Sequence, residues 1–431
     1  MTAAPRTAPR PLHQLTGLRL FAALAVYFSH VAAPAGSPDW LRALQKSGYA
    51  GVTFFFVLSG FVLALNYFDT LRTPRQVRSY VAARIARVFP LYLVALAWPA
   101  VHLWASGKLP EWHLLQKVLG IQAWNPDLHV AFGFLGPAWS ISVELFLYAT
   151  LPLLVPLVRL LDRHLATLLT AIALVLAGLF LLAWLFDAVG RGDLAPADPA
   201  SAHRWLYRTP LLRVGDFLVG ILAARVYLRI RDRRANARLG AWLVPVAIAA
   251  TVLLAAQTSL VNTAWSWDAM YAVPAVTLIL GLAMAPESPV ARLLSLRGVV
   301  FLGEASFAFY LCHIEVTRLV GAGAWENGVT PQTVVLELVN LLFATAVAIG
   351  LHVGVERPAR SVVRRLLDPP ARVRTTRQEP VRPLDDAADL LDEAVTAPIP
   401  VARPMHRPTG QRVPGPRTGE APARRPLVPL G

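Results

Sequence analysis

The chain has 431 residues, of which 55% are hydrophobic and 16% charged, and its formal net charge is +15. This composition is too apolar for a soluble globular protein and fits a multi-pass membrane protein. The single cysteine, Cys312, excludes an intramolecular disulfide and a cysteine-rich metal site.

Ten apolar segments recur along the chain, each close to the ~20 residues that a helix needs to cross a bilayer. The sequence therefore predicts an all-α membrane protein with about ten transmembrane helices. The predicted spans are residues 15–33, 49–68, 88–105, 139–158, 165–189, 210–228, 241–257, 269–285, 299–320 and 333–354.

The charges of the connecting segments predict the orientation. If the N-terminus is cytoplasmic, most Arg and Lys residues fall in the cytoplasmic segments, as the positive-inside rule requires. We expect both termini in the cytoplasm and the protein in the plasma membrane. The predicted parts are a short N-terminus (1–14), a membrane domain (15–360) and a disordered, Pro- and Arg-rich cytoplasmic tail (361–431).

Arg19 and His30 lie in the first predicted span, where ionisable side chains are costly unless they face protein or water. Eleven residues are close to three helical turns, so both would share one face, roughly 16 Å apart along the axis. We interpret Arg19 as a charged anchor and His30 as a catalytic acid or base. The alternative is a structural pair that hydrogen-bonds neighbouring helices.

Arg84 and Arg87 are three residues apart and share a helix face at the cytoplasmic entrance of the third span. Guanidinium groups match phosphate oxygens, so the pair could clamp the phosphates of a cytoplasmic ligand. Positive-inside charge or contact with lipid headgroups is the alternative interpretation.

Ser140 and Glu144 lie four residues apart in the sequence W-S-I-S-V-E, which opens the fourth span. Glu144 could pair with an intramembrane arginine or orient His30. It could also serve only as a helix cap or an ion-pair partner.

Ser306, Tyr310 and His313 fall on one face of the ninth span by their i, i+4, i+7 spacing. They could bind substrate, or they could form a polar seam between helices. Arg213 and Asp216 are three residues apart in the sixth span, and they could simply pair with each other.

Seven stretches in chain order together resemble the acyltransferase-3 family of integral membrane acyltransferases. They run over about residues 12–360. They are Arg19 followed by His30, G-V-T-F-F-F-V-L-S-G-F from Gly51, R-I-A-R-V-F-P from Arg84, W-S-I-S-V-E from Trp139, L-R-V-G-D-F-L-V-G from Leu212, S-F-A-F-Y-L-C-H from Ser306 and V-E-R-P from Val355.

The resemblance implies an enzyme that moves an acyl group, often acetyl, from cytoplasmic acyl-CoA to a hydroxyl of a glycan or a small molecule. Acyl-CoA would be a co-substrate, with no bound cofactor and no metal. The resemblance also implies that His30 and Arg19 are essential and that Arg84 and Arg87 take part in handling CoA. We expect Ser140, Ser306, Tyr310 and His313 to bind substrate, and Glu144 to assist His30.

Two positions depart from the family pattern. Thr53 stands where relatives usually carry an acidic residue, and Asp216 stands where Glu is commoner. If the missing acid orients the histidine in relatives, Glu144 or another group has to do so here.

Two other classes of function fit the same residues. Intramembrane Arg, His and Glu also mark transporters and proton-coupled channels. A membrane scaffold whose tail recruits partners is the third class. Membrane lipids and the substrates are the expected partners, and nucleic acid is not expected.

Overall fold

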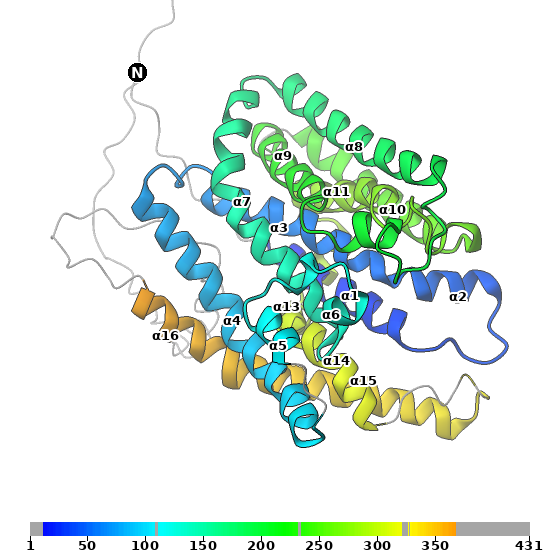
Figure 1. The fold of residues 1–431 in the computed structure, drawn as a ribbon. Helices are drawn as coiled ribbons and strands as arrows, with labels where there is room; N and C mark the ends of the chain where they lie inside the picture. The colour runs from blue at the N-terminus through cyan, green and yellow to red at the C-terminus, as the bar shows by residue number, and fades with distance from the viewer. Residues whose placement is uncertain (1–11, 108–110, 232–233, 321–325, 327, 368–431) are drawn as a thin grey trace, which may run out of the picture. The chain divides into compact units, whose positions relative to one another are not determined.

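The computed structural model describes residues 12–107, 111–231, 234–320, 326 and 328–367. Figure 1 shows them as a bundle of helices, and no strand occurs among them. The α-helices are α1 (His13–His30), α2 (Asp39–Lys46), α3 (Gly51–Tyr67), α4 (Pro74–Ala105), α5 (Glu111–Val118), α6 (Leu128–Phe132), α7 (Trp139–Leu161), α8 (Leu165–Ala188), α9 (Val214–Ile230), α10 (Arg234–Ala255), α11 (Ala269–Met284), α12 (Pro289–Leu294), α13 (Arg297–Glu304), α14 (Ser306–Val320), α15 (Pro331–Leu351) and α16 (Arg357–Leu367).

Short helical turns of other types connect some of these helices. The 3₁₀ turns are Ser47–Ala50, Gln122–Trp124, Gly136–Ala138 and Thr258–Leu260, and the π-helical turns are His203–Arg208 and His352–Glu356. The turn at Gly136–Ala138 leads directly into α7, so it fixes where Ser140 and Glu144 enter the bundle.

Local sequence signals set where two of the longest helices begin. Thr73 caps α4 through a capping box with Gln76, and Thr330 caps α15 in the same way with Thr333. A proline occupies the first turn of each helix, where its missing N–H costs nothing.

Glycines allow the central helices to approach closely. A Cβ on Gly60 of α3 would lie 2.1 Å from the Phe217 carbonyl oxygen of α9, and a Cβ on Gly220 of α9 would lie 2.0 Å from that of Val57. Gly17 of α1 plays the same part against the Leu294 carbonyl oxygen of α12, and Gly303 of α13 does so against the Thr16 carbonyl oxygen of α1. These contacts enclose α1 within the bundle, where it touches α3, α11, α13 and α14.

Six helical segments of the described residues are long and apolar enough to cross a membrane: Asp39–Tyr67, Pro74–Ala105, Gly136–Leu161, Leu165–Ala188, Ala235–Ala255 and Pro331–Val362. Helices α13 and α14 count as a seventh if the pair, which is bent by 64°, is taken as one span. The prediction of an all-helical membrane protein is confirmed, whereas the count of ten spans is not. Helix α1 carries polar residues at both ends, and α9 and α11 have only 17 and 16 residues.

Most of the two predicted terminal parts of the chain lies outside the described residues. Residues 1–11 and 368–431, which include most of the predicted disordered tail, lie beyond the described residues. Residues 361–367, which the prediction assigned to that tail, belong instead to α16.

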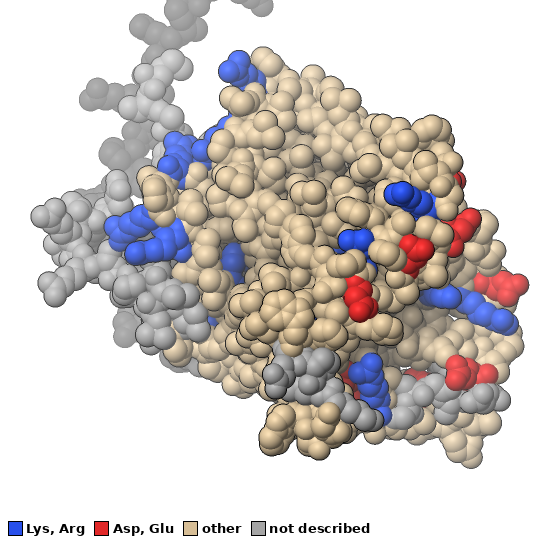
Figure 2. All heavy atoms as spheres, viewed as in Figure 1, with Lys and Arg blue, Asp and Glu red and all other residues tan. Residues whose placement is uncertain are grey.

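Charged side chains gather at the ends of the bundle. Figure 2 shows Lys and Arg without acidic residues on the side where α4 begins, acidic and basic residues together on the opposite side, and a broad band of mostly uncharged residues between them. This is the distribution expected of a membrane protein whose ends lie in water.

Candidate active site

Helix α1 carries both Arg19 and His30. Arg19 lies in the first half of the helix and is half-buried, whereas His30 is its last residue and is exposed. The chain becomes extended at Val31. The two side chains are therefore about three turns apart, roughly 16 Å along the helix.

The His30 ring is held by its own helix. Nδ1 lies 2.8 Å from the Val26 carbonyl oxygen, an acceptor, so Nδ1 carries the proton and donates it. The Nε2 lone pair of a neutral ring then remains available as a base. The Ser29 hydroxyl also lies 3.5 Å from Nδ1.

His313 of α14 lies next to His30, with ring centroids 5.2 Å apart. It is buried, and its Nδ1 lies 2.8 Å from the Tyr310 carbonyl oxygen. Its Nε2 has no hydrogen-bond partner within the described residues. The structure therefore brings these two predicted site residues together from opposite ends of the sequence.

Ser140 and Tyr310 meet at a second point, the loop before α7. The Ser140 hydroxyl donates to the Pro137 carbonyl oxygen at 3.0 Å, and the Tyr310 hydroxyl donates to the same oxygen at 3.3 Å. Ser306 is buried on the same helix as Tyr310, and its hydroxyl has no partner among the residues described.

Glu144 is within electrostatic reach of Arg19. Its carboxylate accepts a hydrogen bond from the Tyr148 hydroxyl one turn later in α7. The described contacts of His30 are with Val26, Ser29 and His313, so no contact in this part of the chain supports the hypothesis that Glu144 orients His30.

Arg84 occupies a cage of three tyrosine rings. Its guanidinium carbon lies 5.3 Å from the Tyr67 ring centroid, 5.7 Å from that of Tyr148 and 6.0 Å from that of Tyr80. It also donates to the Tyr67 hydroxyl at 3.1 Å, and only 5% of it is exposed. These contacts immobilise the side chain, which is a structural arrangement for a buried cation.

Arg87 lies about one turn further along α4 and is half-buried. It is within electrostatic reach of Arg19, and Arg19 is also within reach of the carboxylates of Glu144 and Glu356. The structure thus groups Arg19, Arg87 and Glu144, which come from three different helices, at a level of the bundle remote from His30.

Thr53 belongs to a separate buried cluster. Its hydroxyl accepts a hydrogen bond from Arg213 at 3.1 Å, and Arg213 pairs with Asp216 at 2.8 Å and with Asp268 at 2.9 Å. The expected pairing of Arg213 with Asp216 is confirmed. Position 53 therefore faces Arg213 and not His30, so the missing acid leaves no gap beside the histidine.

Sequence reasoning missed several members of these clusters. Asp268 and the tyrosines around Arg84 carry no motif signal. Glu356 lies in V-E-R-P, which marked the family resemblance without a role, and the His352–Glu356 spacing of four residues was the signal that could have indicated a pair.

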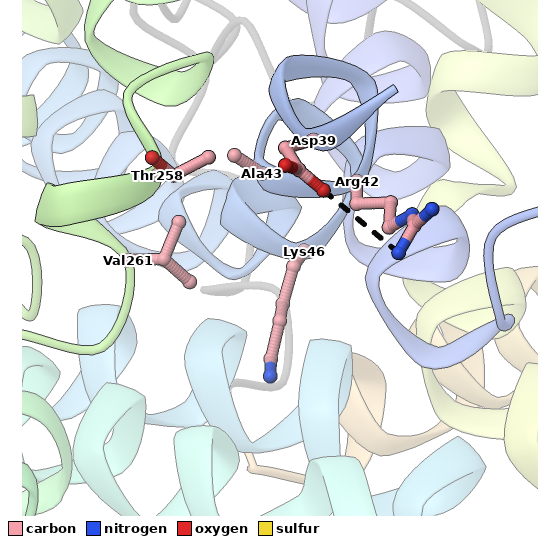
Figure 3. Close-up of a pocket in the computed structure, with 6 residues that line it drawn as sticks. All are labelled: Asp39, Arg42, Ala43, Lys46, Thr258 and Val261. Carbon is pink, nitrogen blue, oxygen red and sulfur yellow. Dashed lines mark ion pairs between the residues drawn. The ribbon is translucent and has the colours of Figure 1, made fainter. Parts of the chain in front are cut away.

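Within the described residues, no group of three or more His, Cys, Asp or Glu side chains could hold a metal ion. A surface pocket of about 300 Å³ lies between α2 and the turn at Thr258–Leu260 (Figure 3). Its lining includes Asp39, Arg42 and Lys46, but none of the predicted site residues.

Comparison with known proteins assigns a family to this arrangement. The family model described as "Acyltransferase domain" matches residues 12–354. The chain is 32% identical over 382 residues to the acyltransferase MdmB of Streptomyces mycarofaciens, covering 84% of this chain and 94% of that relative.

Two more distant relatives are similar over most of this chain. The exopolysaccharide production protein ExoZ of Rhizobium meliloti is 24% identical, covering 74% of this chain and 93% of the relative. The O-acetyltransferase OatA of Staphylococcus aureus is 22% identical, and the match covers 82% of this chain but 58% of OatA. No solved structure matches significantly.

Proposed function

Because the chain belongs to this acyltransferase family and is an O-acyltransferase, we propose that it moves an acetyl group from acetyl-CoA to a hydroxyl group. The acceptor is a glycan or a hydroxylated small molecule. The O-acetyltransferase and exopolysaccharide relatives support this choice of acyl group and acceptor. The proposal locates the protein in the plasma membrane.

The observation that carries the proposal is the placement of Arg19 and His30 on one helix. Arg19, with Arg87 beside it, offers positive charge for the anionic groups of the donor. The roughly 16 Å of helix between Arg19 and His30 leaves room for the extended arm that joins those groups to the thioester. Arg84 contributes to this site by holding Tyr148 in place, since its own cation is caged.

His30 acts on the acceptor through Nε2. In the direct route Nε2 takes the proton of the acceptor hydroxyl while the hydroxyl oxygen attacks the thioester carbonyl carbon. The carbon–sulfur bond then breaks, and the departing thiolate takes the proton from His30. The products are the ester and free CoA.

An acyl-imidazole route uses the same atoms in a different order. Nε2 attacks the thioester carbonyl and releases the thiolate, and the acceptor hydroxyl then attacks the acyl-imidazole. The ester forms, the imidazole is restored, and the hydroxyl proton ends on the thiolate. In both routes the exposed position of His30 at the end of α1 gives the acceptor access.

The test is thiol release from acetyl-CoA by the purified, detergent-solubilised protein with a panel of sugar and small-molecule acceptors. We expect acceptor-stimulated release that falls by roughly 10²–10⁴-fold in His30→Ala, the scale expected when a catalytic base is removed. His129→Ala, which changes an exposed histidine outside the site, is the matched control. Retained transfer in folded His30→Ala protein, or substrate uptake by proteoliposomes without thioester consumption, would overturn the proposal.

A further inference from the structure

The π-helical turn His352–Glu356 joins α15 to α16 and contains a buried carboxylate. This carboxylate belongs to Glu356, the second residue of V-E-R-P, and only 3% of the residue is exposed. Such π-helical turns are rare and often occur at functional sites, because the wider turn re-aims side chains.

A chain of hydrogen bonds fixes the Glu356 carboxylate from one side. His352 donates from Nδ1 to Glu356 Oε2 at 2.8 Å, and its Nε2 accepts from Arg357 Nε at 3.2 Å. Arg357 also donates to Glu304 Oε2 at 3.2 Å. His352 is itself buried, so both of its ring nitrogens are engaged and its orientation is set.

The turn that carries Glu356 packs against α4, the helix of Arg87, which belongs to the candidate donor site. Glu356 is within electrostatic reach of Arg19 of α1, and also of Arg87 of α4 and Arg360 of α16. Arg19 and Arg87 carry like charges that repel each other across the bundle. A buried carboxylate within electrostatic reach of both cations lowers this repulsion and restrains both side chains.

We propose that Glu356 is a positioning residue that holds Arg19 and Arg87 in the arrangement that binds the anionic groups of the acyl donor. This inference rests on the proposed function, and it assigns a role to V-E-R-P. His352 acts as the support of Glu356, and Arg357 and Glu304 complete that support. Glu356 itself does not contact the reacting atoms.

The test separates donor binding from chemistry. Glu356→Gln keeps the shape of the side chain and a carbonyl oxygen for His352 but removes the charge. We expect the KM for acetyl-CoA to rise about tenfold, with kcat and the KM for the acceptor little changed. Glu356→Asp keeps the charge on a shorter side chain and should restore part of the donor affinity.

The opposite outcome is equally informative. If Glu356 were only a competing counter-charge, Glu356→Gln would bind acetyl-CoA more tightly than the wild type. Tighter binding, or an unchanged KM for acetyl-CoA, would overturn the inference. Glu315→Gln, which alters a carboxylate paired with Arg318 elsewhere on α14, is the matched control.

Two further measurements keep the inference testable. If Glu356→Gln does not fold, His352→Gln removes the support but keeps the Glu356 charge. We expect this variant to show a smaller rise in the KM for acetyl-CoA. An unchanged KM for acetyl-CoA in His352→Gln would contradict the inference. Calorimetric titration of the wild type with CoA identifies which idea has failed. Absent CoA binding contradicts the proposed function, whereas normal binding with an unaffected Glu356→Gln contradicts only the role of Glu356.

Discussion

Three arginines of the same bundle illustrate how surroundings decide what one residue type does. Arg84 is enclosed by the rings of Tyr67, Tyr80 and Tyr148 and has little exposed surface. Arg19 and Arg87 are half-buried and lie within each other's electric field. A caged cation stabilises the fold, whereas two neighbouring cations that are partly exposed can attract an anion. The proposed donor site therefore consists of Arg19 and Arg87.

Lys117 is a buried lysine that lies outside the predicted spans, and it predicts how the stability of the fold changes with pH. Burial lowers the pKa of this lysine from its ordinary value of 10.5 to about 7. Its ammonium group donates to the Ala131 carbonyl oxygen at 3.3 Å. Between pH 7 and 10.5 the unfolded chain binds a proton here that the folded chain does not, so the contribution of Lys117 to stability rises with pH.

Lys117→Met removes this titration while keeping most of the side-chain volume. We expect the variant to have the higher thermal unfolding midpoint at pH 7, by a few degrees, and the difference to shrink as the pH approaches 10. Unfolding of both proteins in detergent, followed by circular dichroism across this range, measures it. Lys46→Met changes an exposed lysine and serves as the control, and a difference for Lys117→Met that stays constant with pH would refute the assignment.

Helix α1 organises the site because it packs closely on its neighbours along its length. Gly17 permits contact with the Leu294 carbonyl of α12, and Gly303 of α13 permits contact with the Thr16 carbonyl. At its far end, Gln45 of α2 donates to the Val31 carbonyl oxygen at 2.7 Å. With both ends fixed, α1 holds Arg19 and His30 at a constant separation.

The contact between α3 and α9 gives a prediction at the scale of helices. A Cβ on Gly60 would lie 2.1 Å from a backbone oxygen of α9, so Gly60→Ala must push the helices apart. We expect a loss of stability of about 1–3 kcal/mol, or failure to fold. Gly178→Ala in α8, where no atom lies within 4 Å of the added Cβ, is the control and should be neutral or slightly stabilising.

That prediction is measured as a shift of the thermal unfolding midpoint of the detergent-solubilised protein. Equal stability of the Gly60 and Gly178 variants would contradict the close packing of α3 on α9. A wild-type midpoint with lost acyl transfer would contradict it as well, because Gly60 is expected to serve packing alone.

The sequence predicted local relations well and long-range ones poorly. Spacing within one helix identified Ser306, Tyr310 and His313 as one group. In the structure Tyr310 donates to the Pro137 carbonyl oxygen, and the His313 ring lies beside that of His30. Spacing could not indicate that His313 reaches α1, because only tertiary packing brings those helices together. Asp268 was missed for the same reason, since it reaches Arg213 from a distant part of the chain.

The number of spans was predicted less well than the helical class. Apolar segments long enough to cross a bilayer are recognised by length and hydropathy alone. Helix α1 combines an apolar middle with polar ends that the site requires, so such a test does not select it, and α13 and α14 bend between Glu304 and Ser306. Functional residues thus weaken the very signal by which a span is recognised.

At the scale of the whole molecule, the ends of the bundle differ in charge, and this supports a defined orientation. Lys and Arg gather on the side where α4 begins (Figures 1 and 2), and Arg87 lies in the half of α4 nearer this end. A donor from the cytoplasm would meet this positive end first, which agrees with a donor site at Arg19 and Arg87. His30, three turns further along α1, would then lie toward the opposite face.

This orientation predicts which loops a membrane-impermeant thiol reagent can reach. Cys312 is the single cysteine and is buried, so an introduced cysteine reports its own position. Arg163→Cys, between α7 and α8, should be labelled only after the cytoplasmic face is opened. Asp193→Cys and Ser106→Cys should be labelled on intact cells, because these exposed residues lie beyond the opposite ends of α8 and α4.

Two outcomes would contradict this orientation. If Arg163→Cys and Asp193→Cys are labelled from the same side, α8 does not cross the membrane. Reversed labelling of all three would place His30 on the cytoplasmic side and the arginines outside, and cytoplasmic acetyl-CoA could then not reach Arg19 by the route proposed.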